Sequence, residues 1–215
     1  MIHVIGDSHV GVFAGLWQPH FPVWPERMPV LVPGFAAVHL GPALAYHLVE
    51  PEAWSRANLF HALGDVPAGA AVLLVFGEID CRAHLLWQAE RQRRAPAELA
   101  AECAERYLRA AAEVRALGYR VMLWGVVPSA RDGAHAPLDF PAMGTCRERN
   151  AVTRSFNAAL AALCRPAGLG FASVFDALVT ADGLNRAEYY GSDGMHLGAA
   201  ALPLVRAAVG ERENA

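Results

Sequence analysis

The 215-residue chain lacks an excess of charge of either sign, a long apolar run and any closely paired cysteines. Its 18 Lys and Arg against 21 Asp and Glu leave a net charge of −3, which provides no basic surface for nucleic acid or an anionic membrane. No apolar run reaches the roughly 20 residues that cross a bilayer. The first residues lack the basic and apolar regions of a signal peptide, so we expect a cytoplasmic protein with neither nucleic acid nor membrane as partner.

The four cysteines contain no C-x-x-C pair. They are Cys81, Cys103, Cys146 and Cys164. A disulfide framework, a zinc site and a thiol nucleophile are the functional interpretations of such residues. Cysteine is also among the most frequently buried residue types, so we expect free and mostly buried thiols.

What the sequence does contain is enough apolar material for a substantial core. Hydrophobic residues make up 54% of the chain and charged residues 18%, which is typical of a compact globular protein rather than a disordered one. The length suits one core, and neither a linker nor an internal repeat divides it. We therefore predict a single domain over residues 1–215.

Short apolar runs alternate with helical patterns along the whole chain. The predicted strands are residues 2–5, 35–40, 70–76, 119–127 and 171–175, and the predicted helices are 10–17, 43–48, 53–63, 96–117, 147–164 and 199–209. The proline-rich stretch 18–33 and the stretch 131–145 are predicted loops. This alternation indicates an α/β domain with a parallel sheet of about five strands, helices on both faces and right-handed crossovers.

The most informative stretch is Gly6-Asp7-Ser8, directly after the first predicted strand. A strand that ends in this turn places the serine hydroxyl at the carboxyl edge of the sheet, where open α/β sheets bind ligands. Asp193 and His196 stand three residues apart near the other end of the chain. We predict that Ser8 is a nucleophile, His196 its base and Asp193 the residue that orients the base. The backbone N–H groups of Ser8 and Gly41 are the predicted oxyanion donors.

These motifs resemble the blocks of the SGNH/GDSL hydrolase superfamily. The matching residues are Gly6-Asp7-Ser8, Gly41, Gly77-x-x-Asp80 and Asp193-x-x-His196. The resemblance implies a flavodoxin-like, three-layer α/β/α sandwich and a Ser-His-Asp triad. It also implies esterase, lipase or carbohydrate O-deacetylase activity on a small-molecule acyl ester, with no cofactor and no metal.

The chain departs from the family in the third block. The family has Gly-x-Asn-Asp there, and the asparagine donates to the oxyanion, whereas this chain has Ile79 in its place. Loss of one such donor typically lowers the rate by about 10²–10³. Arg82 is the candidate replacement, or it binds an acidic group of the substrate, or it forms a structural ion pair with Glu78 or Asp80. Glu78 and His9 are further candidates for substrate contact, and His9 is equally well explained as structural.

Three other functions use the same residues. An acyltransferase would pass the acyl group from Ser8 to a sugar hydroxyl, and an inactive protein of this fold would serve as a glycan-binding or scaffold module. The Asp7-Ser8-His9 spacing also resembles the first block of calcineurin-like metallophosphoesterases, but the later ligand blocks of that family are missing. We therefore predict a serine-dependent hydrolase of an O-acyl ester, either a small ester or an acylated sugar.

Overall fold

Five short apolar segments lie side by side as parallel strands in the computed structural model, which describes residues 1–17, 24–134 and 141–210. The strands of the described residues are β1 (Ile2–Gly6), β2 (Glu26–Arg27), β3 (Phe35–His39), β4 (Ala71–Val75), β5 (Arg120–Trp124) and β6 (Gly170–Ala172). Their order is β2-β3-β1-β4-β5-β6, and only the short edge strand β2 is antiparallel to its neighbour. The five parallel strands follow the flavodoxin order, which confirms the predicted fold class.

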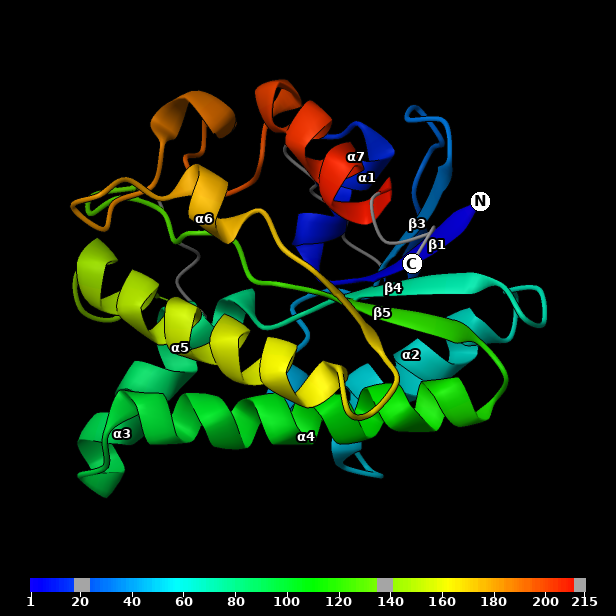
Figure 1. The fold of residues 1–215 in the computed structure, drawn as a ribbon, viewed down its shortest axis with the longest axis horizontal. Coiled ribbons are helices and arrows are strands. Elements are labelled where there is room, and N and C mark those ends of the chain that lie inside the picture. The colour runs from blue at the N-terminus through cyan, green and yellow to red at the C-terminus, as the bar shows by residue number, and fades with distance from the viewer. Residues whose placement is uncertain (18–23, 135–140, 211–215) are drawn as a thin grey trace.

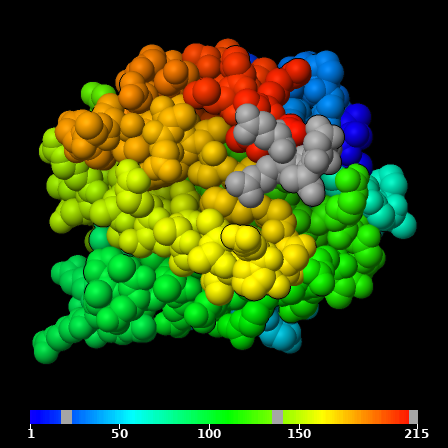
Figure 2. All heavy atoms as spheres, in the orientation of Figure 1, coloured from blue at the N-terminus to red at the C-terminus, as the bar shows by residue number. Residues whose placement is uncertain are grey.

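Helices cover both faces of this sheet (Figure 1). The helices α1 (Gly11–Ala14) and α7 (Leu202–Gly210) lie over one face, and α2 (Trp54–Leu63), α4 (Pro96–Ala116) and α5 (Cys146–Cys164) lie over the other. Figure 2 shows the same layers in space-filling form, with α7 in red above α5 and α4 in green below it. The layers form because neighbouring strand residues point to opposite faces. Ile5 and Leu74 enter the core under α4, whereas Val4 and Leu73 enter the core under α7.

The two long helices begin where the sequence provides a start signal. Pro96 occupies the first turn of α4, where its missing N–H leaves no donor unsatisfied. Thr145 and Glu148 form a capping box at the start of α5, in which each side chain accepts a backbone N–H from the other residue. These signals explain why both predicted helices lie within one residue of the observed bounds.

Short helical elements differ more from the prediction. The predicted helix 10–17 is a 3-10 turn η1 (Ser8–Val10) followed by α1, and Gly15 ends it in a left-handed conformation. The predicted helix 43–48 is the 3-10 helix η2 (Ala45–Val49), and the predicted last helix begins as η5 (Ala199–Ala201). The end of the predicted strand 171–175 lies in α6 (Phe175–Leu178), and η4 (Ala187–Tyr189) follows it. These elements are too short for a periodic pattern to define them.

The segment after β4, for which the sequence predicts no helix or strand, is helical. It forms a π-helical turn η3 (Asp80–His84) that continues into α3 (Leu85–Gln92). Within the predicted loops, residues 18–23 and 135–140 lie outside the described residues, and β2 forms in the remainder of the first loop. All four cysteines are buried free thiols, as expected. None of the helices in the described ranges is both long and apolar enough to traverse a bilayer.

Candidate active site

The turn that presents Ser8 is held by its neighbours on both sides. Gly6 ends β1 at a point where any Cβ would collide with the carbonyl of Val75. The N–H of Asp7 donates to that carbonyl at 3.0 Å. The Asp7 carboxylate accepts the backbone N–H of His9 at 2.9 Å and so caps η1. Asp7 therefore serves local hydrogen bonding, and Ser8 is left half-buried at the carboxyl edge of the sheet.

The structure brings Ser8, His196 and Asp193 together from opposite ends of the chain. His196 Nε2 lies 2.7 Å from Ser8 Oγ, and His196 Nδ1 lies 2.6 Å from Asp193 Oδ2. The other carboxylate oxygen of Asp193 accepts the backbone N–H groups of Met195 and His196 at 2.9 and 3.0 Å. The carboxylate is thereby fixed in orientation, and it holds the imidazole in the tautomer that presents Nε2 to the serine.

The ionisation of this group suits proton transfer at neutral pH. Burial opposes the charge of Asp193, but hydrogen bonds from His196 and from two backbone N–H groups lower its pKa to about 2. Burial lowers the pKa of His196 below its ordinary 6.5, and the hydrogen bond to Asp193 offsets this only in part. At neutral pH the pair is therefore a carboxylate next to a neutral imidazole, which is the state in which His196 accepts a proton.

Two backbone donors lie beside the serine. The N–H of Leu40 donates to the Gly6 carbonyl at 2.7 Å, so Gly41 follows β3 next to the point where Ser8 follows β1. Gly41 has a φ of +86°, and a Cβ there would meet the ring of Trp24 at 2.6 Å. The N–H groups of Ser8 and Gly41 donate to no backbone or side-chain acceptor in the described ranges. Ile79, which stands where the SGNH/GDSL motif has an asparagine, is buried and has no side-chain donor to add.

The predicted substrate-contact residues Arg82, Glu78 and His9 form a buried charged network next to His196. Arg82 Nε donates to Glu78 Oε1 at 2.7 Å, and both side chains are more than nine-tenths buried. His9 Nε2 lies 3.8 Å from the other Glu78 oxygen, and the His9 ring lies 4.8 Å from the His196 ring. Of the alternatives for Arg82, the structure therefore shows the ion pair with Glu78.

The charges of this network stabilise one another against burial. Burial favours the neutral acid, but Arg82 and His9 hold the pKa of Glu78 well below its usual range. Burial also opposes protonation of His9, and the nearby carboxylates of Glu78 and Asp7 outweigh it and raise the pKa of His9. Asp80 lies apart from this network: its carboxylate accepts the N–H groups of Ala45 and Tyr46 and so anchors η2 behind Gly41.

His39 is a further polar residue near the site that the sequence analysis does not single out. It ends β3 two residues before Gly41, is 4% exposed and packs edge-on against Trp24. Burial and the nearby His196 and His9 lower the pKa of His39 to about 4, so it is neutral at pH 7. Its position at a strand end, next to a motif glycine, was the available signal.

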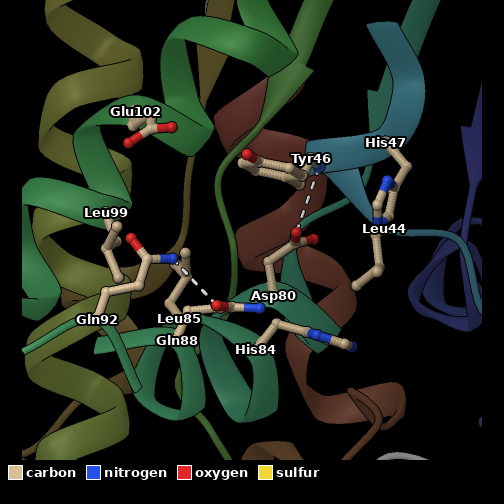
Figure 3. Close-up of a pocket in the computed structure, with 10 residues that line it drawn as sticks. All are labelled: Leu44, Tyr46, His47, Asp80, His84, Leu85, Gln88, Gln92, Leu99 and Glu102. Atoms are coloured by element: carbon tan, nitrogen blue, oxygen red, sulfur yellow. Dashed lines mark hydrogen bonds between the residues drawn. The ribbon is translucent and has the colours of Figure 1, made fainter. Parts of the chain in front are cut away.

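Two cavities of the structure have polar linings that were not predicted, and of these two only the larger includes a neighbour of His196. One, of about 160 Å³, lies between η2, α3 and α4. Figure 3 shows its lining: Asp80 accepts the backbone N–H of Tyr46, and the side-chain amides of Gln88 and Gln92 are hydrogen-bonded to each other. The other, of about 350 Å³, lies beside Met195, the neighbour of His196. In the described part of the chain, no three His, Cys, Asp or Glu side chains gather as metal ligands.

The fold and the site define a class: a three-layer α/β/α protein with a Ser-His-Asp arrangement at the carboxyl edge of its sheet. The chain is similar to a GDSL-like lipase from Bacteroides thetaiotaomicron (TM-score 0.58, 13% identity, covering 98% of this chain and 85% of that one). It is also similar to a carbohydrate acetylesterase from Sinorhizobium meliloti (TM-score 0.58, 17% identity, 99% and 97% covered). A third similar structure is phospholipase A1 from Streptomyces albidoflavus (TM-score 0.55, 17% identity, 96% and 98% covered).

No family profile and no curated protein sequence matches the chain. The structural matches nevertheless cover nearly all of it, from β1 to α7. The chain therefore has the SGNH/GDSL hydrolase fold, as its sequence motifs predict. At these identities the similarity defines the fold, and the chemistry must be argued from the site itself.

Proposed function

We propose that this protein is a serine-dependent hydrolase that cleaves an O-acyl ester, either a small ester or an acylated sugar. The observation that carries the proposal is the 2.7 Å contact between Ser8 Oγ and His196 Nε2, with Asp193 on the far side of the imidazole. In this arrangement the carboxylate orients the imidazole, and the imidazole activates the serine hydroxyl for attack on a carbonyl.

The reaction proceeds in two halves at this site. Ser8 Oγ attacks the acyl carbonyl while His196 Nε2 takes the hydroxyl proton, and the N–H groups of Ser8 and Gly41 donate to the oxyanion. His196 then gives that proton to the leaving alcohol, which departs and leaves an acyl group on Ser8. Water attacks the acyl carbonyl with His196 again as base, and the carboxylic acid is released as the proton returns to Ser8.

The experiment is hydrolysis of 4-nitrophenyl acetate and butyrate by the wild type and by Ser8→Ala, with EDTA present. We expect the substitution to lower kcat/KM by at least about 10³, because the nucleophile of a triad is removed. Ser155→Ala is the matched control, since that hydroxyl lies on the exposed side of α5 and bonds only to its own helix. Equal rates for the wild type and Ser8→Ala would contradict the proposal.

Labelling by a fluorophosphonate separates the neighbouring functions. We expect covalent labelling of the wild type and of Ser155→Ala, but not of Ser8→Ala, because the probe reports an activated serine. A protein that is labelled at Ser8 yet hydrolyses no ester would be tested next for acyl transfer to a sugar hydroxyl. A protein that is not labelled at all would fit a binding module.

A further inference from the structure

The cavity of about 350 Å³ beside the triad has an unusual lining. Three arginines, Arg82, Arg131 and Arg149, contribute to it, and Asp132 is the one acidic residue among its described lining residues. Met195 also lines it and directly precedes the catalytic base proposed above. The cavity therefore reaches the residue that precedes His196, and its described lining residues carry more positive than negative charge.

Arg149 builds the cavity wall. It is 2% exposed, and its guanidinium donates to Ser129 Oγ at 2.8 Å, to the Gly144 carbonyl at 2.6 Å and to the Ala130 carbonyl at 2.8 Å. These acceptors lie at both ends of the segment 129–144, so one side chain ties those ends together. Its only acidic partner in the described part of the chain is Asp132, at 3.1 Å.

Arg131 is held in place without being neutralised. Its Nε donates to the side-chain oxygen of Asn185 at 3.1 Å, and its Nη2 donates to the Asn185 backbone carbonyl at 2.9 Å. Asn185 is 1% exposed, so this anchor is rigid. Both acceptors are uncharged, and among the described residues no carboxylate forms an ion pair with Arg131. Its positive charge is therefore available to a ligand.

Arg82 closes the cavity on the side of the triad. Its ion pair with Glu78 is nearly fully buried, and Glu78 also faces His9, so one carboxylate serves two basic side chains. Arg82 and Arg149 are buried, where protein screens charge less than water does, whereas Arg131 is exposed and can reach a ligand from solvent. Together these three cations favour an anion. The planar guanidinium fork matches the geometry of carboxylate and phosphate oxygens.

We propose that this cavity binds an anionic group, a carboxylate or a phosphate, of the same molecule whose ester is presented to Ser8. The inference rests on the proposed function, because the bound molecule is a substrate only if Ser8 cleaves its ester. It narrows the substrate to an acylated acidic sugar or a similarly charged alcohol. Arg131 makes the direct contact, Arg149 shapes the wall, and Arg82 contributes charge from the side of the triad.

The test is a direct binding measurement that requires no turnover. D-glucuronate, D-glucose 6-phosphate and D-glucose are titrated into the wild type by calorimetry at low salt. We expect one or both acidic sugars to bind, and the Kd of glucose to be at least about tenfold higher. The affinity for the acidic sugar should fall as salt is added. The two acidic sugars distinguish a carboxylate site from a phosphate site. Glucose binding as tight as that of both acidic sugars would overturn the proposal.

Substitutions locate the binding in the cavity. Arg131→Gln is expected to weaken the bound acidic sugar about tenfold or more, and Arg131→Lys is expected to weaken it less, since the charge is kept and only the fork is lost. Arg154→Gln is the matched control, because that exposed arginine pairs with Asp176 on the outside of α5. Equal weakening in Arg131→Gln and Arg154→Gln, or no weakening in Arg131→Gln, would overturn the proposal.

Inhibition of ester hydrolysis connects the cavity to the reaction. We expect the acidic sugar to inhibit cleavage of 4-nitrophenyl acetate competitively, with a loss of inhibition in Arg131→Gln and not in Arg154→Gln. Non-competitive or absent inhibition despite binding would overturn the link to the substrate. If the protein binds the acidic sugar but shows no hydrolysis that depends on Ser8, the anion site is supported and the proposed hydrolase is refuted. The failure of one proposal can therefore be distinguished from the failure of the other.

Discussion

The carboxyl edge of the sheet holds two polar clusters of opposite character. The triad of Ser8, His196 and Asp193 is partly open to solvent, with 15% of the His196 side chain and 27% of the Asp193 side chain exposed. The neighbouring pair of Glu78 and Arg82 is closed, with 8% and 3% exposed. The triad keeps its imidazole neutral and ready to accept a proton, whereas the closed pair holds two full charges in place.

Under the proposed function, one edge of the sheet holds a reacting cluster and, next to it, a structural one. An open cluster changes its protonation at each step of a reaction and can be substituted without unfolding the protein. A buried ion pair changes nothing during the reaction, but removal of one partner leaves an uncompensated charge in the interior. We therefore expect substitutions in the triad to affect activity and substitutions in the closed pair to affect stability.

The largest expected effect is on activity, in Asp193→Asn. An amide cannot hold His196 in the tautomer that presents Nε2 to Ser8, so kcat is expected to fall by about 10⁴ with little change in Tm. The measurement is hydrolysis of 4-nitrophenyl acetate together with thermal unfolding. Asp176→Asn, which removes an exposed carboxylate paired with Arg154, is the control and should retain full activity. A large fall in the Tm of Asp193→Asn would contradict the expectation that substitutions in the triad affect activity and not stability.

The next effect is on stability, in Glu78→Gln. Arg82 would lose the carboxylate of its buried ion pair, which is expected to lower the free energy of unfolding by about 3–5 kcal/mol. Denaturant titration measures this quantity. Glu113→Gln is the control, since that carboxylate pairs with Arg56 at a site where it is nearly half exposed, and its loss is expected to be below about 1 kcal/mol. Equal losses in the two variants would show that burial of the pair is unimportant.

A smaller change is expected at the junction of the two clusters, in Ile79→Asn. The substitution adds a side-chain donor at the position where the family has its oxyanion asparagine, and we expect kcat to rise by roughly tenfold. This gain is smaller than the 10²–10³ lost when such a donor is removed from a site built around it. Ile79→Leu, which has a similar size and no donor, is the control. A rate increase in both variants would attribute the change to packing rather than to the oxyanion.

The smallest effect concerns pH. His196 must be neutral to accept the Ser8 proton, and its pKa lies below 6.5, so activity is lost only as the pH falls through that lowered value. A profile of kcat/KM between about pH 4 and 8 should therefore have its acid limb below pH 6.5. His9→Gln removes a positive charge that lowers the pKa of His196, and we expect the limb to move toward higher pH. A limb already at or above pH 6.5 in the wild type would contradict this assignment.

Much of the site could be predicted because its parts are local. The turn at Ser8 follows directly from an apolar strand and Gly6, and Asp193 reaches His196 across three residues. The charged network was only partly predictable. The spacing of Glu78 and Arg82 allowed an ion pair, but Asp80 was an equal candidate until the structure showed it bonded to the backbone of Ala45 and Tyr46.

The arginine cavity was beyond prediction because its residues come from separate segments. Arg82 follows β4, Arg131 follows β5, and Arg149 lies in α5. The sequence singles out Arg82 as a candidate contact of an acidic substrate group but gives no such signal for Arg131 or Arg149, and the anchor of Arg131 on Asn185 spans 54 positions. No local pattern encodes a contact of that length.

By itself, the sequence determined the order of strands and helices, the start of both long helices and the positions of the residues that carry chemistry. Periodicity, capping and turn residues act over a few positions, so they can be recognised in a linear chain. The tertiary structure alone decided which charges meet, namely that Arg82 pairs with Glu78 rather than with Asp80 and that Arg131 has no ion pair among the described residues. The physical reason is that burial and charge pairing depend on distances in space, which are set only when the strands align and bring their ends to one edge.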